Sequence, residues 1–171
     1  MNALLLDGDS VYACIENNYR QDPDKLCAGL YHAGGWKLFS RAEFWHEVER
    51  YTHLFKSTLG ESSLVLFIKK PDIDLLAGYI GAMRAGRLPA QISYPSSKVG
   101  PAEYQRKVNH ILELTGARCV FTDAGGAAAF EGLEGITLLT PEQLTQETAD
   151  AVANAEALHR TLMTEAGFMA K

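Results

Sequence analysis

Residues 64–92 read LVLFIKKPDIDLLAGYIGAMRAGRLPAQI, and this stretch decides the fold. It opens with a five-residue apolar run, 64–68, which is typical of a strand buried on both faces. Residues 73–85 are apolar nearly all round and predict a buried helix, which Gly86 ends. Residues 88–92 predict a second short strand. The strand–helix–strand order indicates a right-handed crossover that makes the two strands parallel.

The same alternation continues toward the C-terminus. Pro101 begins a predicted helix that ends at Gly116, and residues 118–122 and 136–139 predict two more strands. The connecting segment 125–135 is rich in small residues, so we expect it to be flexible and to add no bulk to a core. Together these elements predict an α/β fold, a largely parallel sheet flanked by helices on both faces.

The N-terminal part predicts a different arrangement. Residues 11–19 predict a short amphipathic helix, which ends before Pro23 because a residue that precedes proline avoids helical backbone. Residues 26–31 and 36–39 predict two strands around a Gly34-Gly35 turn. We therefore expect an N-terminal antiparallel hairpin ahead of the parallel sheet.

The helix that follows this hairpin has the clearest boundaries in the chain. Ser40 and Glu43 have the spacing of a capping box, and Gly60 is a plausible stop. Apolar side chains then recur at helical spacing and form one stripe. The stripe consists of Phe44, Val48, Tyr51, Phe55 and Thr58.

The chain divides into two parts by composition. Residues 1–140 form the predicted α/β unit, and residues 141–171 form an Ala-rich tail. A helix is expected over 149–166, but its apolar stripe is thin. We expect this tail to dock weakly on the unit that precedes it.

Composition narrows the class of partner. The 171 residues carry a formal net charge of −5, which argues against a dedicated nucleic-acid binder. Residues 1–10 lack the basic residues of a secretory signal, and the apolar stretch 73–85 is shorter than the ~20 residues of a membrane span. The three cysteines, Cys14, Cys27 and Cys119, are far apart and indicate reduced thiols rather than a disulfide or zinc framework. These features predict a cytoplasmic protein without membrane or nucleic-acid partners.

Glycine-rich loops that would bind phosphate are weakly represented. Residues 81–87 have the spacing of G-x-x-x-x-G-K-[ST], but Arg87 and Leu88 replace the last two residues. The stretch also ends a predicted helix, whereas a phosphate loop precedes one so that its N–H groups point at the anion. Gly125 and Gly126 follow a strand without a supporting third glycine or basic residue.

The histidines and basic residues each have two interpretations. His46 and His53 lie two helical turns apart, too far to hold one metal alone, so a solvated helix face is the simpler interpretation. Lys69 and Lys70 follow a strand, at the sheet edge where ligands of open α/β sheets gather. A small basic patch could meet a nucleotide phosphate or could be a solvated face. The patch comprises Lys98, Arg106, Lys107 and His110.

Several segments occur in the order found in one large enzyme superfamily. They are Asp22-Pro23-Asp24-Lys25, WKLFSRAEF (36–44), the apolar run 64–68, residues 73–90, Tyr94-Pro95 and LELTGARCVFTD (112–123). In order and spacing, residues 11–123 resemble the first part of the adenylate-forming superfamily. This superfamily comprises AMP-dependent acyl-CoA synthetases, acyl-AMP ligases and nonribosomal adenylation domains. The form of residues 93–107 is more similar to the enzymes that act on acyl or aryl acids.

The resemblance implies the scaffold of a ligase that activates carboxylic acids as acyl-adenylates, using ATP, Mg²⁺ and in some members CoA. By the same resemblance, this region forms part of one wall of the acyl pocket. The superfamily's phosphate loop, aromatic-Gly-x-Thr-Glu segment, ribose-binding Asp and catalytic lysine do not occur here, and the chain ends about where the loop is due. We therefore expect a subdomain inactive alone, with no catalytic or metal-binding residue assigned and its cofactor-binding residues unknown.

The implied partner is the rest of an adenylate-forming enzyme, or a second copy bound through an apolar face. Two alternatives stay open. One is a non-catalytic interaction module that docks on a larger ligase or a carrier-protein system. The other is an unrelated nucleotide-binding α/β domain, for which only Lys98, Arg106 and Lys107 argue.

Overall fold

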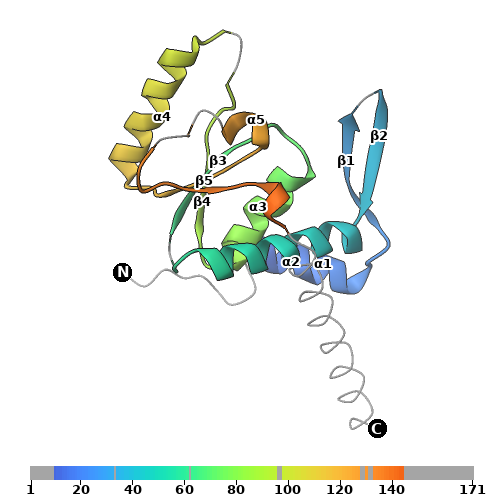
Figure 1. Cartoon of the computed structure of the whole chain (residues 1–171). Coiled ribbons are helices and arrows are strands. Elements are labelled where there is room, and N and C mark those ends of the chain that lie inside the picture. The colour runs from blue at the N-terminus through green and yellow to red at the C-terminus, as the bar shows by residue number, and fades with distance from the viewer. Residues whose placement is uncertain are drawn as a thin grey trace, which may run out of the picture.

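A four-stranded parallel sheet forms the centre of the protein (Figure 1). The computed structural model describes residues 10–32, 34–61, 63–95, 98–127, 130 and 133–144. The strand order is β4-β3-β5-β6, and each neighbouring pair is parallel. The strands are β3 (Leu64–Ile68), β4 (Leu88–Gln91), β5 (Cys119–Thr122) and β6 (Thr137–Leu139).

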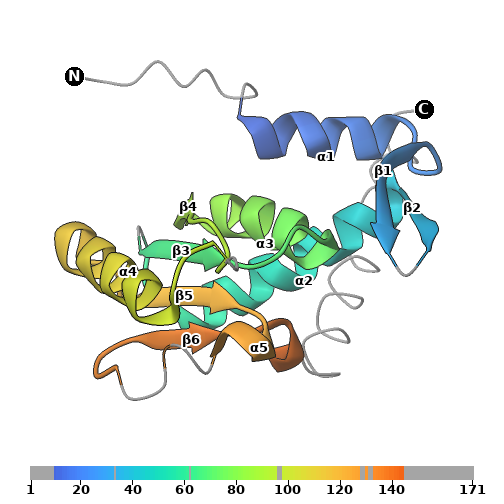
Figure 2. The same ribbon diagram turned by 90° about the horizontal axis from the view of Figure 1, so that it is seen from above.

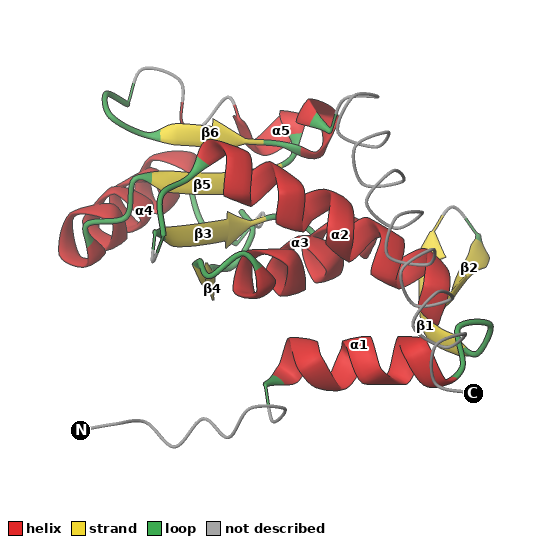
Figure 3. Cartoon of the chain, turned by 90° about the horizontal axis from the view of Figure 1, so that it is seen from below, coloured by secondary structure: helices red, strands yellow, loops and turns green. Residues whose placement is uncertain are grey.

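Helices cover both faces of this sheet, which confirms the predicted α/β class (Figures 2 and 3). Two long helices, α2 (Arg41–Thr58) and α3 (Ile73–Arg84), pack on one face, and α4 (Pro101–Thr115) packs on the other. Successive side chains of β3 point to opposite faces of the sheet. Val65 and Phe67 belong to the core beneath α2 and α3, whereas Leu66 and Ile68 belong to the core beneath α4. This alternation explains why the whole strand is apolar.

The predicted N-terminal hairpin is also present, beside the main sheet (Figure 1). Its strands, β1 (Leu26–His32) and β2 (Gly35–Ser40), pair antiparallel, with a register shift between Leu26 and Ala28. The amphipathic helix α1 (Val11–Gln21) precedes it. Tyr19 of α1 stacks on Trp45 of α2, with ring centroids 5.9 Å apart.

The sequence predicts the limits of α2 well and its buried face in part. Ser40 caps the helix, and the reciprocal hydrogen bonds of a capping box with Glu43 are both present. Val48, Tyr51 and Phe55 are buried as expected, but Phe44 is only half-buried and Thr58 is exposed. The buried set also includes Trp45, Thr52 and Leu54.

Two predictions from the sequence are wrong. Segment 125–135 does add bulk to a core, because Phe130 is buried in the α4 core, and the short helix α5 (Ala124–Ala127) extends into its first residues. The helix over 73–85 is not buried all round either, because Leu76 is 42% exposed. An apolar composition does not by itself show whether a second layer covers a helix.

The Ala-rich tail is only partly described. A short 3₁₀ helix, η2 (Pro141–Gln143), begins it. The expected helix over 149–166 and the expected docking of the tail lie outside the described residues.

Helices α2 and α3 approach each other closely at Gly81. A Cβ atom built on Gly81 would lie 2.8 Å from Tyr51 Cβ and 3.0 Å from the carbonyl oxygen of Val48. Neither partner is the free end of a flexible side chain, so the two helices would have to separate. Gly81 is therefore a packing residue, and the glycine spacing of residues 81–87 has a structural origin.

We predict that Gly81→Ala lowers the free energy of unfolding by about 1–3 kcal/mol, because overpacking outweighs the better helix propensity of alanine. Urea unfolding followed by circular dichroism measures the change. Gly60→Ala is the matched control, because its nearest atom outside its chain neighbours, Ser63 Oγ, lies 3.8 Å from the built Cβ. A Gly81→Ala protein as stable as the parent would show that the helices can move apart at no cost.

Candidate functional site

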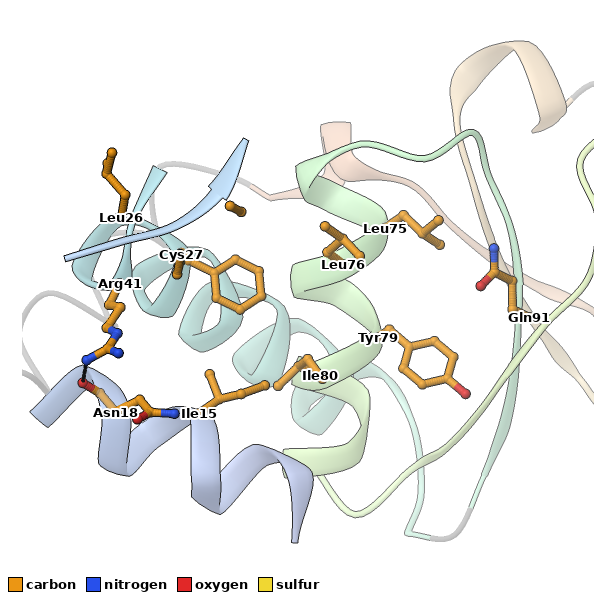
Figure 4. A pocket seen from close by; sticks show the side chains of 12 residues that line it. Ile15, Asn18, Leu26, Cys27, Arg41, Leu75, Leu76, Tyr79, Ile80 and Gln91 are labelled. Atoms are coloured by element: carbon orange, nitrogen blue, oxygen red, sulfur yellow. Dashed lines mark hydrogen bonds between the residues drawn. The ribbon is translucent and has the colours of Figure 1, made fainter. Parts of the chain in front are cut away.

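A cavity of about 530 Å³ lies between the N-terminal elements and α3 (Figure 4). Its walls come from α1, β1, the first turn of α2, α3 and the end of β4. Most of the lining side chains are apolar. They are Ile15, Leu26, Ala28, Phe44, Leu75, Leu76, Tyr79 and Ile80, together with Asn18, Cys27, Arg41 and Gln91.

The apolar wall of the cavity is the outer face of α3. Leu75 and the small residues Ala77, Gly78, Gly81 and Ala82 are buried, whereas Leu76 lies on the opposite face and is 42% exposed. Figure 4 shows Leu76 and Ile80 directed toward α1 and β1, with Tyr79 farther along the helix toward β4. Tyr79 donates a hydrogen bond to the carbonyl oxygen of Pro89, 3.1 Å away, which fixes its ring beside the edge strand.

Polar groups gather at the end of the cavity formed by α1 and β1 (Figure 4). Arg41 Nη1 donates to the carbonyl oxygens of Asn18, at 2.8 Å, and Asp22, at 3.5 Å. These bonds tie the last turn of α1 to the start of α2. The Arg41 guanidinium therefore stabilises the wall formed by α1 and also lines the cavity.

Cys27 lies at the same end of the cavity. Its thiol donates to the carbonyl oxygen of Ser40, 3.5 Å away. Partial burial raises the pKa of Cys27, the Arg41 cation opposes this increase, and the Glu43 carboxylate adds to it. The thiol is therefore less ionised than a free cysteine at neutral pH.

Lys69 follows β3, where the sequence indicated a gathering point for ligands, and its side chain is buried. Its ammonium group pairs with Asp72, and it lies 3.8 Å from Asp74. Asp74 in turn accepts a hydrogen bond from Tyr51, 2.9 Å away, and burial followed by the Asp74 charge raises the pKa of Tyr51. The Lys69 charge thus ties the end of β3 to the start of α3. Lys70 is exposed, and its ammonium lies 5.2 Å from the Tyr94 ring centroid.

The glycines after β5 take part in packing and hydrogen bonding within the fold. Asp123 Oδ1 accepts hydrogen bonds from the backbone N–H of Gly126, at 2.7 Å, and from Tyr94 OH, at 3.2 Å. Thr122 Oγ1 donates to the carbonyl oxygen of Ile68, 2.7 Å away. A Cβ atom on Gly126 would collide with that hydroxyl. The glycine is needed for close packing at this strand end.

The remaining candidates do not join the cavity. Arg87 is buried and donates to the carbonyl oxygens of Ala85, at 2.6 Å, and Leu59, so it anchors a turn. On α2, His53 is exposed and His46 half-buried. The basic patch is exposed on and before α4, at the far end of the molecule from β1 (Figures 1 and 2).

The described residues lack both a metal-binding cluster and a membrane-spanning helix. They contain no group of three or more histidine, cysteine or acidic side chains placed to hold a metal ion. They also contain no helix with the length and hydropathy needed to cross a membrane.

Sequence reasoning did not find the cavity. Its walls come from residues as far apart as Ile15 and Gln91, and no spacing rule connects them. The sequence contains one indication of the cavity: α3 carries more large apolar residues than one buried face needs. That excess, with Leu76 and Ile80 one turn apart, predicts a second partner for the helix.

The described fold is similar to part of several ligases. The fatty acid AMP ligase of Legionella pneumophila matches with a TM-score of 0.71 and 13% sequence identity, over 83% of this chain and 25% of that chain. A fatty acyl-adenylate ligase from L. pneumophila, solved with acyl adenylate and pyrophosphate, gives 0.69 and 14%, over 82% and 25%. The N-terminal subdomain of Klebsiella oxytoca NpsA, in complex with 3-hydroxybenzoyl-AMSN, gives 0.66 and 14%, over 84% and 33%.

This chain has the fold of the N-terminal part of adenylate-forming ligases. The resemblance drawn from the sequence is thus confirmed at the level of fold. The chain spans about a quarter of the length of the two Legionella ligases. No family model matches the sequence, and no curated protein sequence matches it significantly.

The three thiols are predicted to react in a fixed order. Burial raises the pKa of Cys119 to about 12, whereas Cys14 is exposed. With an aromatic disulfide near pH 8, close to the ordinary cysteine pKa, we expect Cys14 to react first, Cys27 more slowly, and Cys119 only on unfolding. A raised pKa leaves less thiolate at a given pH, so the Cys27 rate should continue to rise with pH above the ordinary pKa range of cysteine.

Stopped-flow absorbance resolves these phases, and Cys14→Ser should remove the fastest one. Rapid labelling of all three thiols in the folded protein would contradict the burial of Cys119.

Proposed function

We propose that this chain is the N-terminal scaffold subdomain of an AMP-forming ligase that activates an acyl or aryl carboxylic acid as its acyl-adenylate. The observation that carries the proposal is the fold match to the N-terminal part of ligases, over about 80% of this chain. The segments that resemble the superfamily in sequence support it independently. Three free cysteines fit a reducing compartment, so we place the protein in the cytoplasm.

In this proposal the chain supplies structure, and the rest of the ligase supplies the reactive groups. Adenylate formation needs fixed positive charge around the transferring phosphoryl group. Among the described residues, the two buried cations have other partners: Lys69 pairs with Asp72 and Asp74, and Arg87 binds backbone carbonyls. Neither is free for a nucleotide, so we assign no catalytic role to the described residues.

ATP and Mg²⁺, and CoA in some ligases, are the cofactors that such a reaction uses. ATP would supply the AMP group, and Mg²⁺ would neutralise its phosphates. The donor set described above does not form a magnesium site. We therefore propose that these groups bind mainly to the part of the ligase outside this chain.

The cavity beside α3 is our candidate for holding the apolar body of the acid. Its volume is in the range of small-molecule pockets, and its walls are mostly apolar with few polar groups. An alkyl or aryl group would lie between Ile80 of α3 and Ile15 of α1. This assignment agrees with the wall of the acyl pocket that the resemblance implies.

A second candidate is a non-catalytic interaction module that docks on a larger ligase or a carrier-protein system. One observation favours it: large apolar side chains are exposed on the hairpin, including Trp36 and Tyr31. Both candidates make this chain one part of a larger assembly. They differ in whether that assembly needs this chain for adenylation.

We predict that the purified chain does not catalyse acid-dependent exchange of pyrophosphate into ATP. The assay is run with decanoate and with benzoate, and the L. pneumophila fatty acid AMP ligase serves as the positive control. Exchange above the acid-free blank would contradict the scaffold role. The reading frame after the Lys171 codon gives a second test, because a phosphate loop encoded there would support the proposal. Co-expression of that downstream segment with this chain should then produce adenylation activity, and the activity should be lost when this chain is omitted.

We also predict that decanoate binds in the cavity of the isolated chain and that Ile80→Trp weakens this binding about tenfold, because the indole fills the space. Chemical-shift changes in titrations with decanoate measure the affinity. The matched control is Leu114→Trp on the exposed face of α4, where Leu114 is 72% exposed. Equal affinity of both variants and the parent would exclude the cavity as the acid site.

A further inference from the structure

A single cation lines the cavity beside α3, and it lies at one end. Arg41 is the first residue of α2 and is half-buried. It is the only charged residue among the described residues that line the cavity, and Asn18 and Cys27 lie at the same end (Figure 4). Most of the remaining wall is apolar, so the cavity has one charged end and one apolar end.

The Arg41 guanidinium has donors that are not used within the fold. Its Nη1 donates to the carbonyl oxygens of Asn18 and Asp22 and so caps the end of α1. Among the described residues, neither Nη2 nor Nε donates a hydrogen bond, and no carboxylate forms an ion pair with the guanidinium. The Nε–Nη2 edge of arginine is a planar fork that binds a carboxylate through two parallel hydrogen bonds.

The carboxylate closest to Arg41 in sequence is engaged elsewhere. Glu43 accepts hydrogen bonds from the backbone N–H and the hydroxyl of Ser40, at 2.7 and 2.9 Å. The Arg41 charge acts at the cavity end, where it opposes the rise in the Cys27 pKa that burial causes. A cation without an ion pair beside an apolar wall favours a ligand that brings one negative charge.

The apolar part of the cavity extends away from Arg41 between two helices. On α1, Ile15 lies about one turn before Asn18, and on α3, Ile80 lies about one turn after Leu76. Figure 3 shows α1 running toward the hairpin and α3 running away from it. Both isoleucines therefore lie farther from the hairpin than the residues at the Arg41 end.

The strands of the central sheet end on the same side as Arg41. Gln91, the last residue of β4, and Leu75, in the first turn of α3 after β3, both line the cavity. Figure 3 also shows β3 and β6 pointing toward the hairpin. The carboxyl ends of strands are where open α/β sheets bind their ligands. An acid whose carboxylate lies at Arg41 would thus present it at the edge where the rest of a ligase would act.

We propose that Arg41 positions the substrate of the cavity, a monocarboxylic acid with an apolar body, by binding its carboxylate. The apolar body extends from Arg41 into the space between Ile15 and Ile80. This inference rests on the proposed function. It adds the orientation of the acid and the residue that selects a carboxylate over an uncharged head group.

Binding of octanoate and of 1-octanol to the full chain tests the proposal, because these probes differ only in the head group. Chemical-shift titrations should show that the parent binds octanoate at least about tenfold more tightly than 1-octanol. In Arg41→Gln this preference should reverse, since a carboxylate without a partner is costly beside an apolar wall. If Arg41 only caps α1, the substitution would weaken binding of both probes alike and leave their ratio unchanged.

Two further variants control for charge and for shape. Arg20→Gln removes one positive charge from α1, outside the cavity lining, where Arg20 pairs with Glu16. This variant should keep the preference of the parent. Arg41→Lys keeps the charge but loses the fork, so the preference should become smaller without reversing.

The parent protein provides a measurement that needs no variant. Nuclear Overhauser effects from the terminal methyl group of octanoate should reach the methyl groups of Ile15 and Ile80. These effects and the parent's preference for octanoate decide the question even if Arg41→Gln does not fold. Octanoate that binds no more tightly than 1-octanol to the parent would overturn the proposal.

The same titrations separate this proposal from the one on which it rests. Octanoate binding that Ile80→Trp weakens but Arg41→Gln leaves unchanged would overturn the role of Arg41 and keep the cavity as the acid site. Absence of octanoate binding would overturn both assignments of the cavity. The scaffold role is tested independently, by the pyrophosphate exchange assay.

Discussion

The structure depends on the burial of β3 on both of its faces. Val65 and Phe67 pack toward α2 and α3, while Leu66 and Ile68 pack toward α4. Because the strand also lies between β4 and β5, it touches every layer of the α/β unit. Aromatic packing strengthens this centre, where the rings of Phe67 and Phe121 lie 5.0 Å apart. A polar residue in the middle of β3 would therefore place a polar group in one of the two cores.

The polar groups around this centre are used to hold the elements together. The Thr122 hydroxyl, on β5, donates a hydrogen bond to the last residue of β3. The Lys69 ammonium, just after β3, pairs with Asp72 at the start of α3, and Arg87 binds the backbone of the turn before β4. Lys69 and Thr122 lie at the carboxyl ends of parallel strands, where an α/β enzyme places its catalytic residues, whereas Arg87 lies at the opposite edge of the sheet. Their internal pairing agrees with the division of labour that we propose, in which this chain positions the acid and the rest of a ligase activates it.

Helix α3 connects that scaffold to the cavity. Its small residues, Gly78 and Gly81, let it approach the sheet and α2, while Leu76 and Ile80 on the outer face line the cavity. The far wall of that cavity is β1, one strand of the N-terminal hairpin.

Apart from the short helix α5, the sequence by itself determined which of the described helices and strands of the α/β unit form and in what order. The capping box at Ser40, the apolar run 64–68 and the Gly116 stop are local features, and each depends on residues within a few positions of one another. The resemblance to adenylate-forming enzymes also came from such local segments. Only the tertiary structure decided that Phe130 belongs to the core, that Lys69 is engaged, and that Ile15 faces Ile80 across a cavity. Periodicity shows which face of an element is apolar, but what covers that face depends on elements distant in sequence, and their placement follows from packing the whole chain.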